Sequence, residues 1–152
     1  MPKSIQLNIN MESKDIYLHV ASNNSLDYFP WNTNNNFTVK LPSKLSLDQG
    51  LWEVALMQIR CPASKTKSQI FIKTDIIYDG IDGHNMSPIL RWMEITTRAK
   101  HYDVQLPFYH TIRKKHIDEI SFKIESTDSQ AHSFNNSRAV QCVLHIRQKN
   151  KE

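Results

Sequence analysis

The chain has 152 residues, of which 39% are hydrophobic and 9% aromatic, and this size and composition are typical of one domain with a single core. The net charge of the whole chain, +4, falls well short of the charge that a basic tail for binding nucleic acid would give it. Three glycines leave no cluster for a nucleotide-binding loop, and two cysteines exclude a disulfide framework. No apolar stretch approaches the roughly 20 residues that cross a bilayer, and the N-terminus lacks the apolar run of a secretory signal. We therefore expect one domain over residues 1–152, made in the interior of a cell, with flexible ends near 1–12 and 149–152.

Alternation of apolar and polar residues with a period of two dominates the sequence and predicts strands. Because successive side chains of a strand point to opposite faces, each alternating segment presents one apolar face to a core. Taken in chain order, strands are expected over 16–21, 37–41, 51–59, 69–73, 75–78, 89–95, 102–106, 120–125 and 140–147. The segment 51–59 is apolar on both faces, which is typical of a central strand covered on both sides.

Segments rich in Asn, Asp, Ser and Gly separate these strands and are predicted to be turns, namely 23–36, 42–50, 79–88 and 126–137. No stretch shows three turns of helical periodicity, and 114–120 has room for one helical turn at most. The pattern predicts an all-β fold, a single jelly roll or β-sandwich of about eight strands with little or no helix.

The alternation also predicts which side chains form the core. Trp52, Val54 and Leu56 should lie on one face of a central strand, and Phe122 and Leu144 should pack in the same core.

The sequence shows no motif typical of a metal site or a catalytic nucleophile. The seven histidines include no HxH or HExxH spacing, so no metal site and no cofactor are expected. Cys61 and Cys142 lie on or just after predicted strands, where burial raises a thiol's pKa, and no GxSxG elbow frames a serine. We expect core cysteines, solvated or locally hydrogen-bonded histidines, and no enzyme.

Two segments are candidates for contacts with other molecules. Arg113, Lys114 and Lys115 form the strongest charge feature, which is either a patch that meets phosphate or a solvated loop. Tyr28, Phe29 and Trp31 are unusual for a loop, and they either anchor a subunit contact or fold back to cap one end of the sandwich.

Two stretches of the sequence resemble a known family. In Asp15–Pro62 the matching residues are Ser22, Asn23, Ser25, Tyr28, Pro30, Asn32, Phe37, Lys40, Leu41, Pro42, Leu45, Leu47, Trp52, Glu53, Val54, Ala55, Leu56, Ile59 and Pro62. This stretch resembles the opening of the minor capsid, or penton, proteins of Polinton/Maverick elements and adintovirus-type double-stranded DNA viruses. Ile120–Lys149 is similar to the closing hairpin of the same family. The chain departs from the family pattern at Cys61 and at 135–137, where a glycine-containing turn is usual.

The resemblance implies a single jelly roll that assembles as a ring of five at a capsid vertex. The expected partners are then other copies of the chain, as a homopentamer, and a major capsid protein, and the expected location is the virion. With a ring, Tyr28, Phe29 and Trp31 are expected at or beside an inter-subunit contact. Two alternatives stay open: an intracellular nucleic-acid-binding β-barrel that uses the basic segment, and a domesticated host copy that acts as a protein-interaction module. Any binding of nucleic acid is expected to be weak and nonspecific.

Overall fold

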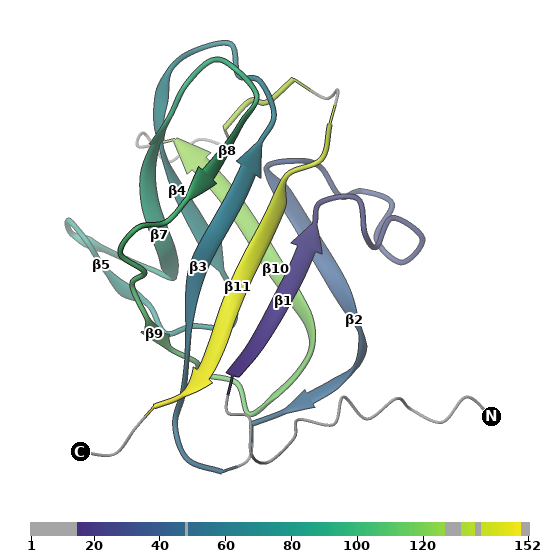
Figure 1. Ribbon diagram of the computed structural model, residues 1–152, viewed down its shortest axis with the longest axis vertical. Coiled ribbons are helices and arrows are strands. Elements are labelled where there is room, and N and C mark those ends of the chain that lie inside the picture. Colours follow the sequence, from purple (N-terminus) through teal and green to yellow (C-terminus); the bar gives the residue numbers. More distant parts are fainter. Residues whose placement is uncertain (1–14, 48, 127–131, 136–137, 150–152) are drawn as a thin grey trace.

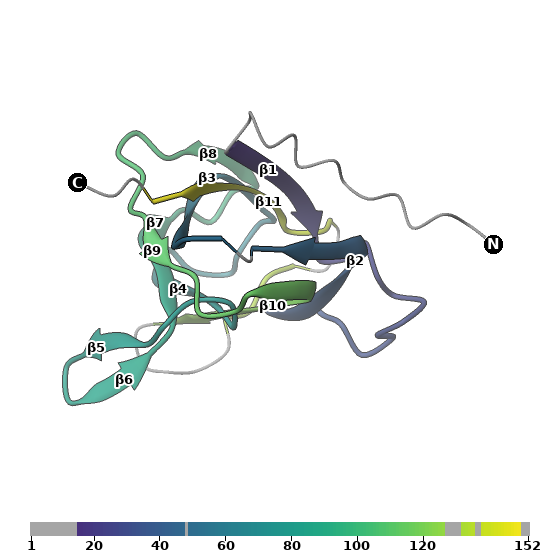
Figure 2. The same cartoon turned by 90° about the horizontal axis from the view of Figure 1, so that it is seen from below.

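Two antiparallel sheets packed face to face form the body of the molecule (Figures 1 and 2). The computed structural model describes residues 15–47, 49–126, 132–135 and 138–149. In chain order the strands are β1 (Asp15–Ala21), β2 (Asn36–Ser46), β3 (Trp52–Cys61), β4 (Ser68–Thr74), β5 (Gly80–Asp82), β6 (Asn85–Ser87), β7 (Ile89–Ile95), β8 (Lys100–Asp103), β9 (His110–Thr111), β10 (His116–Ser126) and β11 (Gln141–Gln148). The described residues contain no helix, and therefore none that is long and apolar enough to cross a membrane.

The strand order is that of a jelly roll. One sheet has the order β1-β11-β3-β8, with β9 also paired to β3, and the other has the order β2-β10-β4-β7. Strands from the two halves of the chain pair as β1 with β11, β2 with β10, β3 with β8 and β4 with β7, and successive pairs alternate between the sheets. This is the arrangement of a long antiparallel hairpin rolled into a two-layered sandwich, so the predicted all-β jelly-roll class is confirmed.

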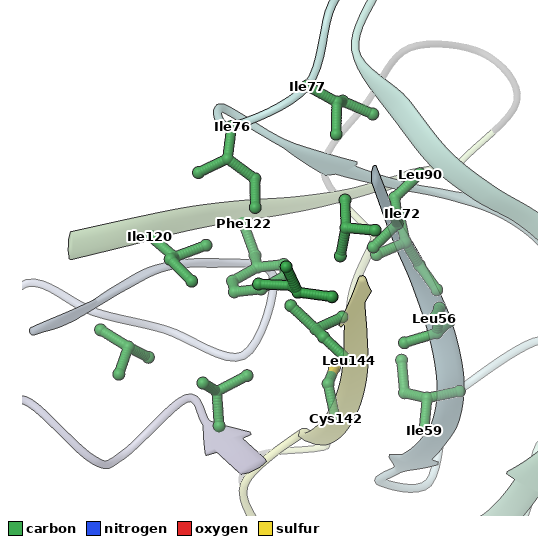
Figure 3. Close-up of a cluster of buried hydrophobic side chains, with 14 of the residues drawn as sticks. Leu56, Ile59, Ile72, Ile76, Ile77, Leu90, Ile120, Phe122, Cys142 and Leu144 are labelled. Carbon is green, nitrogen blue, oxygen red and sulfur yellow. The ribbon is translucent and has the colours of Figure 1, made fainter. Parts of the chain in front are cut away.

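The core lies between the two sheets and draws on both of them (Figure 3). Phe37 of β2 and Phe122 of β10 stack with their ring centroids 5.2 Å apart. All five residues predicted for the core belong to this cluster and are buried, namely Trp52, Val54, Leu56, Phe122 and Leu144. The alternation of period two therefore identifies the inward faces of β3, β10 and β11.

Strand β3 differs from the expectation of a strand covered on both faces. A β-bulge lies at Met57, because Gln58 pairs with Val143 while Leu56 pairs with Leu144. The extra residue reverses the alternation, so the inward residues are Trp52, Val54 and Leu56 before the bulge and Ile59 and Cys61 after it. The outer face is covered in part, because Ala55 is fully buried there before the bulge, whereas the outward-facing Gln58 and Arg60 are exposed.

Strand β2 continues beyond the predicted end at Leu41 and runs through Pro42 to Ser46, so the expected turn over 42–50 is wrong in its first half. Among the described strands β2 pairs with β10 alone, and Pro42 falls in an irregular stretch between the pairs Glu119–Lys40 and Ile117–Leu45. Proline is tolerated there because its missing N–H is not needed by a ladder.

Two further expectations need correction. The segment 75–78 is a turn joined to the next part of the chain by a β-bridge, Ile77 to Ile112, and is not a strand. Residues 79–88, expected to be a turn, contain the short hairpin β5–β6. Residues 114–120, which had room for one helical turn at most, contain the start of β10 at His116. Of the flexible ends expected near 1–12 and 149–152, only Lys149 lies within the described residues, and its N–H donates to the Leu51 carbonyl at 2.7 Å.

Candidate interaction surfaces

The aromatic loop, residues 22–35, connects β1 to β2 across the two sheets and has a backbone ordered by local hydrogen bonds. The Ala21 N–H donates to Asn24 Oδ1 at 2.7 Å, which turns the chain out of β1. The Phe29 N–H then donates to the Ser25 carbonyl at 2.8 Å, and the Asn32 N–H donates to the Phe29 carbonyl at 3.1 Å. Asn and Ser side chains favour such turns because they bond to nearby backbone groups.

The loop is attached along the free edge of β2. The amide of Asn32 clamps the backbone of Thr38, donating to its carbonyl at 2.8 Å and accepting from its N–H at 3.0 Å. The hydroxyl of Ser25 accepts from the Lys40 N–H at 2.8 Å. These bonds satisfy backbone groups that an edge strand would otherwise offer to another chain, so the loop closes this part of the edge against uncontrolled pairing.

A second set of bonds ties the loop to the chain just before β11. Asn34 donates through Nδ2 to the Arg138 carbonyl at 2.8 Å, and the Ser22 hydroxyl lies 2.7 Å from Asn34 Oδ1. The Ser22 hydroxyl also accepts from the Val140 N–H at 3.1 Å. Segments more than 100 residues apart in sequence thereby meet at one end of the sandwich.

The aromatic side chains of this loop point away from the core. Tyr28 is 65% exposed and Trp31 is 70% exposed, whereas Phe29 is partly buried. Phe29 lies edge-on to Trp31, with ring centroids 5.7 Å apart, so the three rings form one surface cluster. The loop backbone is bonded to the edge of its own β2, while the side chains of Tyr28 and Trp31 are exposed.

A hollow of about 390 Å³ adjoins the aromatic loop. Its walls include Leu26, Asn32, Thr33, Asn34 and Arg138. Most of these walls are polar and uncharged, and Arg138 contributes a positive charge beside them. The hollow can therefore accept a polar or acidic segment beside the aromatic loop.

The basic segment Arg113–Lys115 is bonded to its own chain through two of its three residues. Arg113 donates through Nε to the Asp75 carbonyl at 2.8 Å, and Lys114 Nζ lies 3.0 Å from Asp75 Oδ2. The other carboxylate oxygen of Asp75 accepts the Ser121 N–H at 3.0 Å. Two of the three predicted basic-patch residues thus hold the connection between β9 and β10 to the turn after β4, and Lys115 is exposed.

A polar cluster on the outer face of the five-stranded sheet was not expected from the sequence. His145 receives or donates hydrogen bonds at both ring nitrogens, to Tyr109 Oη at 2.8 Å and to Asp15 Oδ1 at 2.8 Å, and it stacks on Tyr17. Arg147 bonds Glu53 at 2.8 Å and lies over the Tyr109 ring. The alternation does place these side chains on the polar face of β1, β3 and β11, but only the strand register brings them together.

The same outer face has an open groove of about 410 Å³ at its other end. Strand pairing sets Gln141, Arg60 and His101 in one row across β11, β3 and β8. The His101 ring lies 3.0 Å from the Asp103 carboxylate, through Nε2 and Oδ1.

His132 and the two cysteines serve the fold. His132 is buried, with its ring nitrogens 3.0 Å from the Ser64 hydroxyl and 3.3 Å from that of Ser126, and burial lowers its pKa below the ordinary value. Because Ser64 is buried as well, this pair is closed to a substrate. Burial raises the pKa of Cys61 to about 12 and also raises that of Cys142, so neither thiol forms the thiolate that reacts. Within the described residues no three His, Cys, Asp or Glu side chains are grouped to hold a metal ion.

Comparison with known proteins gives one structural likeness to report. No family model matches the sequence, and no curated protein matches it. Among solved structures the fold is similar to the crystal structure of the mavirus penton protein, with a TM-score of 0.47 and 9% sequence identity, over 90% of this chain and 99% of that chain.

Proposed function

We propose that the chain is a structural capsid protein, a vertex-type (penton) minor capsid subunit that acts by self-association and by contact with a major capsid protein. In this role it forms a homopentamer within the virion and catalyses no reaction. Its function depends on the shape and chemistry of its surface, which must match a copy of itself and a neighbouring capsid protein.

One observation carries the proposal: polar side chains of the aromatic loop fix its backbone to β2, while its aromatic rings stay exposed. Ser25 and Asn32, which belong to the family-like motif, fix the loop to β2 through backbone hydrogen bonds. Tyr28 belongs to the same motif and is left exposed beside Trp31. A loop that is held rigidly while it presents aromatic rings is suited to a contact, because little conformational entropy remains to be lost on binding.

The jelly roll supports the same role, since this two-sheet fold is common in viral capsids. Fold alone does not establish function, so the loop and the resemblance of both ends of the chain carry the proposal.

Light scattering on a size-exclusion peak, followed by electron microscopy, tests the proposal. The expected particle is a closed ring with five times the 17.8 kDa subunit mass. A chain that stays monomeric across the concentration range of a purified capsid protein would contradict it.

The competing nucleic-acid function depends on the basic segment. Lys114 is already paired with Asp75, which leaves Arg113 and Lys115 as the exposed cations of the three. We expect weak retention on nucleic acid that falls steeply with added salt, because each neutralised phosphate releases counterions. A tight, sequence-selective complex at physiological salt would favour the nucleic-acid-binding barrel instead.

A further inference from the structure

The hairpin β5–β6 projects from the sandwich on the flank opposite the aromatic loop. In the described part of the chain its two strands pair with each other and form a sheet of their own. Figure 1 shows the hairpin at one side and the loop between β1 and β2 at the other, at similar positions along the long axis. Figure 2 shows the same opposition from below.

The hairpin carries apolar side chains that its own chain does not cover. Ile81 is 84% exposed and Met86 is 68% exposed, and the two are direct cross-strand partners, so they lie on the same face. Tyr78, just before the hairpin, is also exposed. Isolated two-stranded hairpins are marginally stable in water, and exposed apolar surface forgoes about 25 cal/mol per Å². These features are typical of an arm that another molecule covers.

The charge of the hairpin is opposite to that of the hollow beside the aromatic loop. Asp79 and Asp82 give the hairpin two negative charges, whereas Arg138 gives the walls of the hollow a positive one. Asp27, the carboxylate of the aromatic loop, is not among the residues that line the hollow. Apolar contacts match as well, since the thioether of a methionine packs favourably against aromatic rings such as Trp31.

The positions of the two surfaces allow a head-to-tail contact. Such a contact uses two different surfaces of the same chain, and it closes into a ring only when each copy is rotated without a rise along the axis. The hairpin and the aromatic loop lie on opposite flanks at similar height (Figure 1), and seen from below both lie toward the four-stranded sheet (Figure 2).

We propose that the β5–β6 hairpin of one copy docks into the hollow beside the aromatic loop of the next copy. Ile81 and Met86 then cover Tyr28 and Trp31, and the hairpin carboxylates face Arg138. This inference rests on the proposed self-association and names the two surfaces that form it.

Complementation between two defective variants tests the docking. The hairpin variant is Ile81→Ser/Met86→Ser, and the loop variant is Phe29→Ser/Trp31→Ser. Each variant alone should be folded and monomeric, because each lacks one half of every contact. An equimolar mixture should form heterodimers that do not grow further, since only one intact hairpin and one intact hollow remain per pair, and sedimentation velocity resolves these species.

Trp92→Ser is the matched control, because Trp92 is also exposed but lies on β7, outside both surfaces, and this variant should assemble like the wild type. If the wild type forms rings and the hairpin variant forms them equally well, the docking is wrong while the proposed function stands. Failure of the mixture to form heterodimers also overturns it. A monomeric wild type, in contrast, contradicts the proposed function itself.

Charge reversal gives an independent test. Arg138→Glu and Asp79→Lys/Asp82→Lys should each weaken association by about tenfold or more, because like charges then face each other across the contact. Combining all three substitutions in one chain should restore assembly. Equal loss in the combined variant would show that the charges do not meet.

Discussion

The aromatic loop and the basic segment Arg113–Lys115 both stand out in the sequence, yet the fold treats them in opposite ways. In the loop the polar groups are satisfied within the chain, while Tyr28 and Trp31 are exposed. In the basic segment Lys114 pairs with the Asp75 carboxylate and Arg113 donates to the Asp75 carbonyl, although Arg113 and Lys115 are exposed. The comparison teaches that a conspicuous run of residues indicates a contact with another molecule only where the fold leaves its chemistry unsatisfied.

The largest expected effect is a loss of stability on changing the core, which lies outside both segments. Trp52→Ala removes a buried ring from β3 together with its bond to the Gln49 carbonyl at 3.0 Å. We expect a loss of about 3–5 kcal/mol in the free energy of unfolding. Urea titration measures it, and an unchanged midpoint would show that the residue does not pack as described.

The next effect tests whether Asp75 holds the basic segment to its own chain. Asp75→Ala removes the acceptor of Lys114 and leaves the partly buried Ser121 N–H without its partner. We expect a loss of about 1–3 kcal/mol in stability. Because Lys114 is then unpaired, retention on heparin at low salt should rise, and Lys115→Ala is the control that should leave stability within about 0.5 kcal/mol. Unchanged stability of Asp75→Ala would mean that the segment is held in another way.

A smaller effect concerns the attachment of the loop. Asn32→Ala removes both bonds to the Thr38 backbone at the edge of β2. We expect about 0.5–1.5 kcal/mol for each bond lost, and faster hydrogen exchange at the amide of Thr38. Exposed Asn23 is the matched control, and Asn23→Ala should leave the exchange unchanged. Slow exchange at Thr38 in the Asn32→Ala variant would contradict the clamp.

The smallest expected effect is a dependence of stability on pH, which comes from histidines outside both segments. Burial lowers the pKa of His132, and also that of His110, so the unfolded chain takes up protons first as the pH falls. Stability is therefore unaffected above the ordinary histidine pKa of about 6.5 and decreases as the pH falls from there toward the lower pKa of the folded state. Urea midpoints at pH 7.5 and 5.5 should differ less for His132→Gln than for the wild type. An equal difference would exclude His132 as a source of the dependence.

The sandwich could be predicted because strands that face one core carry a period of two, which is visible without any knowledge of pairing. What the pattern missed depends on pairing. The bulge at Met57 changes the phase of β3, and the end of β2 at Ser46 depends on its edge position, which makes Pro42 acceptable. The hairpin β5–β6 was hidden because its strands have three residues each and share their Asp, Asn and Gly content with turns.

The candidate surfaces could be predicted in part. Tyr28 and Trp31 are conspicuous as residues, but their exposure follows from Ser25 and Asn32 holding the loop to β2. The pairing of Lys114 with Asp75 joins residues 39 positions apart, so no local pattern contains it. The same holds for the hollow at Arg138, which lies more than 100 residues beyond the loop it adjoins.

The most direct test of self-association through the aromatic loop is the molar mass in solution of the Phe29→Ser/Trp31→Ser variant, measured by light scattering beside the wild type. The expected result is a monomer whose thermal unfolding matches that of the wild-type subunit, because the loop backbone stays attached through Ser25 and Asn32. A variant that assembles like the wild type would contradict a contact at these rings, and a variant that unfolds outright would place them in the core instead.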